Sequence, residues 1–237
     1  NDQIETDYLS ALAERFEYVY PFEASTKIPA KLSVSRLYPG ILDEFDASTD
    51  LGKPESFVLR RPQFEGGGND NRAASVGTAT HLFMQFCDFD SAKADPKSEI
   101  RRLTEKRFIT EKQAAAIDPR KVSAFFASEL FGRIEKADKV WRELRFLRGI
   151  PASELGFEGA SEEDKITVQG VADCVFEENG KLIVVDYKTD FVEDIEELRE
   201  RYAAQLHMYK RLLSESLGKE VTKAIIWSFR FGKELEV

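Results

Sequence analysis

Two aspartates and a lysine lie in one short stretch of the sequence that has the pattern of a β-hairpin. Asn179-Gly180 separates two runs of apolar residues, and a type I′ turn favours this dipeptide because both central positions need a positive φ. Such a two-residue turn fixes the register, and counting outward from it places Asp173 directly opposite Asp186. Lys188 shares the face of Asp186, since side chains two residues apart in a strand point the same way.

The opposed pair of aspartates is unfavourable unless a cation lies near it. Directly opposed residues have Cβ atoms about 4.5–5.5 Å apart, and like charges so placed destabilise a sheet. The apolar run Leu182–Val185 predicts a strand buried on both faces, where unpaired acids are costly. A divalent ion of the Mg²⁺ type binds such carboxylates, and Lys188 beside it is placed to hold a water or a phosphate oxygen. The alternative is a solvated surface face that carries Asp and Lys. The metal-site prediction also depends on the register, because a slip of one residue would move Asp173 to the other face.

Two further residues have the chemistry of metal ligands, but their positions alone do not assign it. His81 lies off the apolar stripe of a predicted helix, where a histidine is more often a surface residue or one satisfied by its neighbours. Glu143 alternates with core residues in a predicted strand. It is either a third acid of the site or a salt-bridge partner on the strand face.

The helix expected after the hairpin carries polar groups on one face. Tyr202, Gln205 and Tyr209 follow helical spacing. Core packing accounts for the two tyrosines equally well. A glutamine between them is less expected, and it could orient Lys188 or a phosphate.

The rest of the composition excludes several other kinds of site. The sequence has no G-x-x-x-x-G-K-[ST], G-x-G-x-x-G or H-E-x-x-H motif, so we expect no ATP, dinucleotide or zincin site. Two cysteines and two histidines, all dispersed, suit neither a zinc site nor an iron–sulfur cluster. So few cysteines indicate a reducing, cytoplasmic compartment, and no apolar run is long enough to span a membrane. The net charge of −9 lowers the expectation of bulk nucleic-acid coating but leaves a local basic channel open.

Hydrophobic periodicity predicts an α/β core with a helical elaboration before it. The expected helices cover residues 4–18, 75–89, 97–107, 110–116, 119–136 and 193–216. The expected strands cover residues 140–149, 165–177, 181–189 and 221–231. We divide the chain into an N-terminal extension or connector that packs on the core (1–60), a flexible Gly-rich loop (61–74) and a core domain (75–237).

Four motifs in this order resemble those of the PD-(D/E)XK nucleases of the RecB type. They are G-T-A-T-H (77–81), G-V-A-D (170–173), D-Y-K-T (186–189) and Y-A-A-Q-L-x-x-Y (202–209). K-I-P-A-K-L-S-V-S (27–35) and the Arg142-Glu143 strand further resemble the carboxy-terminal nuclease region of the AddA helicase–nucleases. The resemblance implies a restriction-endonuclease-like fold, in which helices flank a mixed central sheet.

The resemblance also implies a role for each motif residue. His81, Asp173, Asp186 and the backbone carbonyl of Tyr187 would ligate Mg²⁺, for which Mn²⁺ can substitute, and Lys188 would be the catalytic lysine. Gln205 and Tyr209 match the family's Q-x-x-x-Y motif, with Tyr202 as a candidate assisting residue. Glu143 matches an acid often found on the first core strand. Other branches of the family hold an iron–sulfur cluster with four cysteines, which this chain cannot do.

The function implied is Mg²⁺-dependent hydrolysis of DNA by the exonuclease domain of a helicase–nuclease that acts in double-strand-break repair and recombination. We expect single-stranded DNA ends as substrate and an AddB-like second subunit; helicase domains are absent from this chain. Candidate DNA contacts are Arg101, Arg102, Lys106 and Arg107, although these fit a solvated helix face equally well. The alternatives are a non-catalytic scaffold or DNA-guiding domain, and a stand-alone phage-type exonuclease that would form a ring or clamp.

Overall fold

The computed structural model describes residues 12, 16, 23–37, 70–157 and 159–237. Contacts between Cα atoms divide the chain into two compact units. The first unit combines residues 1–32 with 149–168, and the second combines 33–148 with 169–237. All the predicted site residues belong to the second unit. Apart from two helical residues, Leu12 and Phe16, the predicted helix 4–18 lies outside the described residues, as does the loop at 61–69.

The described helices and strands follow the predicted order of helices, strands, a helix and a closing strand region. The helices are α2 (Glu23–Thr26), α3 (Val34–Leu37), α4 (Asp70–Phe86), α5 (Phe89–Ala94), α6 (Pro96–Glu105), α7 (Glu111–Ala116), α8 (Pro119–Phe126), α9 (Glu129–Glu135) and α10 (Glu196–Leu217). The strands are β1 (Lys31–Ser33), β2 (Lys139–Pro151), β3 (Lys165–Glu178), β4 (Lys181–Lys188), β5 (Val221–Ser228) and β6 (Lys233–Glu236). Among the described residues no helix is long and apolar enough to cross a membrane.

The six strands form one mixed sheet, which confirms the predicted fold class. The order is β1-β3-β4-β5-β6, and β2 pairs with β3 off this path. β3 and β4 are antiparallel, β4 and β5 are parallel, and β5 and β6 are antiparallel. The parallel pair requires a crossover, which α10 provides.

The predicted hairpin between β3 and β4 is confirmed. Asn179 and Gly180 have φ values of 52° and 76°, as a type I′ turn requires. The register runs from the pair Glu178–Lys181 outward to Cys174–Val185. Because this register is the predicted one, Asp173 and Asp186 occupy the next positions beyond the last pair.

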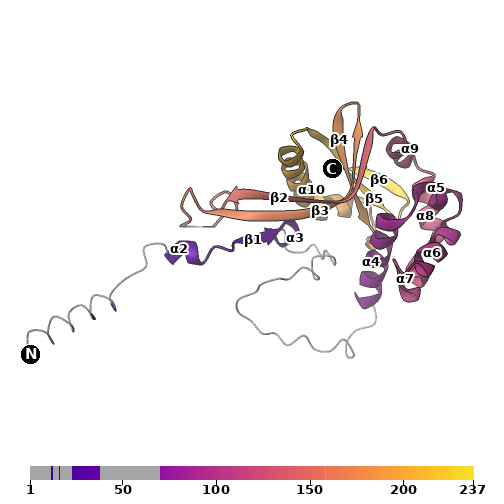
Figure 1. The fold of residues 1–237 in the computed structure, drawn as a ribbon, viewed down its shortest axis with the longest axis horizontal. Coiled ribbons are helices and arrows are strands. Elements are labelled where there is room, and N and C mark those ends of the chain that lie inside the picture. The colour runs from indigo at the N-terminus through magenta and orange to yellow at the C-terminus, as the bar shows by residue number, and fades with distance from the viewer. Residues whose placement is uncertain (1–11, 13–15, 17–22, 38–69, 158) are drawn as a thin grey trace, which may run out of the picture. The chain divides into compact units, whose positions relative to one another are not determined.

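Helices cover both faces of the sheet (Figure 1). On one face, apolar residues of α4 to α9 pack with those of β3, β4 and β5 in a core rich in aromatic rings. Phe125 lies at its centre, with ring contacts to Tyr187, Trp227 and Phe229 among others. α10 covers the other face and packs on β4 and β5. β4 is therefore buried along almost its whole length, as predicted, and charged groups on it lie in a low-dielectric setting.

Several predicted boundaries are wrong for identifiable reasons. α4 begins at Asp70, within the predicted loop 61–74. The predicted helix 119–136 is two helices, because Ser128 accepts a hydrogen bond from the backbone N–H of Phe131 and caps a new helix. The predicted strand 221–231 ends at Ser228, where the chain turns and returns as β6. Thr110 and Gln113 form a capping box at the start of α7.

The first unit contains the distal ends of β2 and β3 together with the N-terminal segment. Within it, Ser25 Oγ donates to Asp164 Oδ2 (2.9 Å), and the backbone N–H of Thr167 donates to the carbonyl of Ala30 (3.0 Å). None of the predicted site residues lies here.

Candidate active site

A buried ion pair marks the carboxyl end of β4. Strand alternation places Asp186 and Lys188 on the same face, and Lys188 Nζ lies 3.0 Å from Asp186 Oδ2. The two residues are 4% and 5% exposed. Lys188 Nζ also lies 4.1 Å from the ring centroid of Tyr202 on α10, a cation–π distance. Two neighbours therefore hold the ammonium group in one position.

Asp173 on β3 faces both β4 and α4. Its Oδ2 accepts a hydrogen bond of 2.7 Å from the backbone N–H of Tyr187, so the side chain replaces a strand partner just beyond the last backbone pair of β3 with β4. Its Oδ1 lies 3.2 Å from His81 Nδ1. Asp173 therefore links the end of β4 to the histidine of α4.

Glu143 brings a third acidic strand position to the same point. Ligand atoms of His81, Glu143 and Asp173 all lie within 4.8 Å of one another. Ligands about 2.1 Å from one shared ion are at most about 4.2 Å apart, so a small closure of side chains would suffice. Glu143 has a φ of 52° within β2, a left-handed conformation that costs a non-glycine residue roughly 1–2 kcal/mol. Backbone strain of this kind clusters at functional sites.

Strong electrostatic coupling joins these groups. Burial alone would lower the pKa of His81, but the charge and hydrogen bond of Asp173 outweigh it and raise the pKa to about 9. Burial would raise the pKa of Asp173, but the His81 and Lys188 cations together with the Tyr187 N–H hold that pKa below its ordinary value. The acids of this group, Glu143, Asp173 and Asp186, outnumber its two cations. A divalent cation would complement this cluster.

α10 contributes a buried polar row to the site. Gln205 is fully buried, and its Nε2 donates to the hydroxyl of Tyr209 (3.2 Å). The Tyr209 ring packs edge-on against Phe146, with centroids 5.3 Å apart. Phe146 in turn lies over Gly170, where an added Cβ would come within 2.3 Å of its ring. The glycine of G-V-A-D is therefore required because a phenylalanine ring occupies the space of its side chain.

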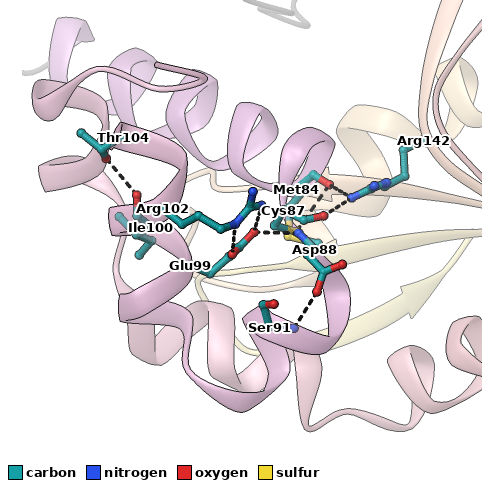
Figure 2. A network of polar contacts seen from close by, with 9 residues as sticks. All are labelled: Met84, Cys87, Asp88, Ser91, Glu99, Ile100, Arg102, Thr104 and Arg142. Atoms are coloured by element: carbon teal, nitrogen blue, oxygen red, sulfur yellow. Dashed lines mark hydrogen bonds and ion pairs between the residues drawn. The ribbon is translucent and has the colours of Figure 1, made fainter. Parts of the chain in front are cut away.

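Arg142, next to Glu143 on β2, fastens the end of α4 (Figure 2). Its Nη1 donates to the carbonyls of Met84 (3.3 Å) and Cys87 (2.5 Å), and its guanidinium lies 4.7 Å from the ring centroid of Phe89. These carbonyls are at a helix C-terminus, which favours a cation. The helix that carries His81 is thus tied to the strand that carries Glu143.

The structure brings most of the predicted site residues together but arranges them differently from the expected ligand set. His81 and Asp173 group with Glu143, whereas Asp186 has an oxygen directed at Lys188. Gln205 and Tyr209 contact each other, and Tyr202 contacts Lys188.

Among the candidate DNA contacts, Arg102 is bound to Glu99, with 2.6 Å between Nε and Oε2. Sequence reasoning missed Asp190, whose Oδ1 accepts from the Tyr202 hydroxyl (2.7 Å). Its place directly after D-Y-K-T was the available signal.

A family match identifies the class of protein to which this fold belongs. Residues 56–236 match the family model described as the PD-(D/E)XK nuclease superfamily, and the chain belongs to that superfamily.

Curated relatives point to one kind of protein within the class. The chain is 36% identical over 239 residues to AddA, an ATP-dependent helicase/nuclease protein, of Clostridium botulinum (strain 657 / Type Ba4), covering 98% of this chain and 18% of the relative. It is 34% identical over 227 residues to the protein of the same name from Clostridium kluyveri, covering 94% of this chain and 18% of that protein. The chain thus spans under a fifth of the length of these relatives. A solved structure described as "Crystal structure of SSO0001" is 20% identical with a TM-score of 0.34, over 67% of this chain and 65% of that one.

Proposed function

We propose that this chain is the metal-dependent nuclease domain of a helicase–nuclease and that it hydrolyses DNA phosphodiesters. The observation that carries the proposal is the convergence of His81, Glu143 and Asp173 within 4.8 Å, next to the buried Asp186–Lys188 pair. Membership of the nuclease superfamily gives this arrangement its chemistry.

The donor set fits a divalent cation. Carboxylate oxygens suit Mg²⁺ and Mn²⁺, and His81 and Asp173 already share a contact that an ion could replace. The imidazole favours Mn²⁺ over Mg²⁺, so we expect both ions to support activity, with Mn²⁺ binding more tightly. The proposed ligands are His81, Asp173, Glu143 and Asp186, with the carbonyl of Tyr187. An ion held there supplies Lewis-acid activation of the phosphodiester and of a water molecule.

The side chains around the ion would orient the substrate. Lys188, fixed between Asp186 and the Tyr202 ring, holds an ammonium group where it can donate to a water or a phosphate oxygen and offset charge that develops on phosphorus. Because both members of the pair are nearly fully buried, this donation acts in a low-dielectric site, where it is stronger than in water. Gln205 and Tyr209 support the same face from α10.

The relatives support a proposal for the wider setting of this domain. Their name describes an ATP-dependent helicase/nuclease, so we propose that a helicase motor delivers single-stranded ends to this domain and that it works beside an AddB-like partner. Exonuclease action in double-strand-break repair and recombination in the cytoplasm fits this assignment. Both cysteines are free and buried, as suits a reducing compartment.

Single substitutions at the buried pair test the proposal. Asp186→Ala and Lys188→Ala should each lower Mn²⁺- or Mg²⁺-dependent cleavage of single-stranded DNA by about 10²–10³-fold. Lys210→Ala, further along α10, is the control and should retain activity. Undiminished cleavage in either site variant would refute the assignment.

The rival function is a non-catalytic scaffold or DNA-guiding domain, which the net charge of −9 would suit if the domain acts only inside a complex. Metal titration separates the two functions. A scaffold need show no Mn²⁺ binding that depends on carboxylates, whereas the proposed site loses its Mn²⁺ affinity in Asp173→Ala.

A further inference from the structure

Phe191 is an exposed aromatic side chain close to the candidate active site. It follows β4 and is 82% exposed, while the next residue, Val192, is 2% exposed. Val192 therefore anchors this part of the loop in the protein, and the Phe191 ring faces solvent. The apolar core gives no reason for a phenylalanine at this position.

Arg230 lies against one face of that ring. Its guanidinium carbon is 3.5 Å from the Phe191 ring centroid and 5.5 Å from that of Phe231. Since Phe191 stays 82% exposed with the guanidinium stacked on it, the opposite face of the ring is open. Within the described part of the chain, no carboxylate lies at ion-pair distance from Arg230, so its charge is available to a ligand.

Both residues are fixed near Lys188. Phe191 is three residues further along the chain, so its Cα is at most about 11 Å from that of Lys188. The backbone N–H of Phe229 donates to the carbonyl of Lys188 (2.9 Å). This hydrogen bond holds the adjacent Arg230 near the carboxyl end of β4. Asp190, which precedes Phe191, accepts from the hydroxyl of Tyr202, whose ring contacts the lysine.

We propose that Phe191 and Arg230 form a platform on which one base of single-stranded DNA stacks next to the hydrolysed phosphodiester. The inference rests on the proposed function and adds the side chains that contact a base of the unpaired strand. Stacked nucleotides advance about 3.4 Å each, so a base a few nucleotides from the cleaved bond would reach the ring. A base inside a duplex is already stacked and paired, and cannot present its face to Phe191.

Charges around the platform favour a base over a phosphate on the open face of the ring. The segment after Phe191 is acidic, and Glu197 in the first turn of α10 binds the backbone that leads into this helix. Glu197 Oε1 accepts from the backbone N–H groups of Glu193 and Asp194 (3.0 and 2.9 Å). Stacking on an aromatic ring does not need the ligand's charge, whereas phosphates would be repelled by these carboxylates. Arg230 is then the cation placed to contact the adjoining phosphate.

Base-dependent binding tests the platform. The full chain is titrated against a fluorescein-labelled oligothymidylate and against a strand of the same length made of abasic sites. EDTA prevents cleavage, and fluorescence anisotropy reports Kd. We expect the wild-type protein to bind the strand with bases about tenfold more tightly. Phe191→Leu should abolish this preference, and Phe191→Trp should retain it.

Phe108→Leu is the matched control, because Phe108 is also exposed but stacks on Phe86 at the end of α4. It should keep the tenfold preference. A preference that survives in Phe191→Leu, or a wild-type protein that binds neither strand or both equally, would overturn the inference. Failure of the proposed function is detected separately, as hydrolysis of bis(p-nitrophenyl) phosphate, which has no base, that persists in Lys188→Ala.

Discussion

Two regions of the second unit bury charged side chains, and they do so in opposite ways. Where α5 and α6 meet the end of α4, Glu99 is 1% exposed. It accepts from Arg102 Nε (2.6 Å) and from the backbone N–H of Asp88 (2.7 Å), as Figure 2 shows. At the end of β4, by contrast, several acids converge with one lysine and one histidine. The first region is a closed network, and the second is a concentration of like charge.

The comparison shows what each region contributes. A buried acid whose acceptors are satisfied stabilises the fold or is neutral to it, and removing one partner is costly. In the second region three acids face two cations, so one negative charge stays unbalanced until an ion binds. Such an excess of negative charge gives the site of a metal-dependent enzyme its affinity for the ion. Substitution should therefore affect mainly stability in the first region and mainly catalysis in the second.

The largest effect is expected from Asp173→Asn. The amide oxygen can still accept from the Tyr187 N–H, but the site loses a negative charge. Cleavage of single-stranded DNA should fall by about 10²–10³-fold or more. The free energy of unfolding measured in EDTA should fall by less than in Glu99→Gln, because Glu143 and Asp186 remain to balance the charges of His81 and Lys188. A variant that keeps its activity, or that loses stability without losing activity, would show that Asp173 acts as Glu99 does, through the stability of the fold.

The reverse pattern is expected from Glu99→Gln. Breaking the pair between the buried Glu99 and the half-buried Arg102 should lower the free energy of unfolding by about 2 kcal/mol, measured by urea denaturation. Cleavage per folded molecule should be unchanged. Glu105→Gln is the control on the same helix. Glu105 is exposed, and its Oε1 lies 4.0 Å from Arg101 Nε. Loss of this surface ion pair should lower the free energy of unfolding by less than about 0.5 kcal/mol. An equal loss in the free energy of unfolding for the two variants would show that the network around Glu99 stabilises the fold no more than a surface ion pair does.

These two regions also differ in how far the sequence predicts them. The Asn179-Gly180 turn fixes the hairpin register locally, so the positions of Asp173, Asp186 and Lys188 follow by counting. The pairing of Glu99 with Asp88 and the position of His81 beside Glu143 depend on how helices pack, which no local pattern encodes. Glu143 is the acid that the sequence supports least, because its left-handed φ is invisible in an alternating strand pattern. Likewise β6 was missed, since the turn after Ser228 lacks a strong hairpin signal.

Arg142 connects the two regions, because it binds the end of α4 and precedes Glu143. Arg142→Met should lower the free energy of unfolding by about 1 kcal/mol and also weaken Mn²⁺ binding about tenfold, as loss of a supporting contact does. Isothermal titration with Mn²⁺ measures the change in affinity, and Arg142→Lys should keep part of the affinity that Arg142→Met loses. Arg102→Met is the comparison: it should destabilise the fold without changing Mn²⁺ affinity. If the two methionine variants have equal Mn²⁺ affinity, Arg142 supports the fold alone.

The smallest effect concerns pH, and it separates the charge of Glu99 from its shape. Burial would raise the pKa of Glu99, but the hydrogen bonds from Arg102 and Asp88 outweigh it and hold that pKa below its ordinary value. A carboxyl whose folded pKa is lowered adds stability above its unfolded pKa of about 4.3 and loses it as the pH falls through the folded value. The stability difference between wild type and Glu99→Gln should thus be constant from pH 7 to about pH 5 and shrink below that. Urea denaturation at each pH measures it, and a difference that is the same at every pH would mean that the geometry of the network, and not its charge, stabilises this region.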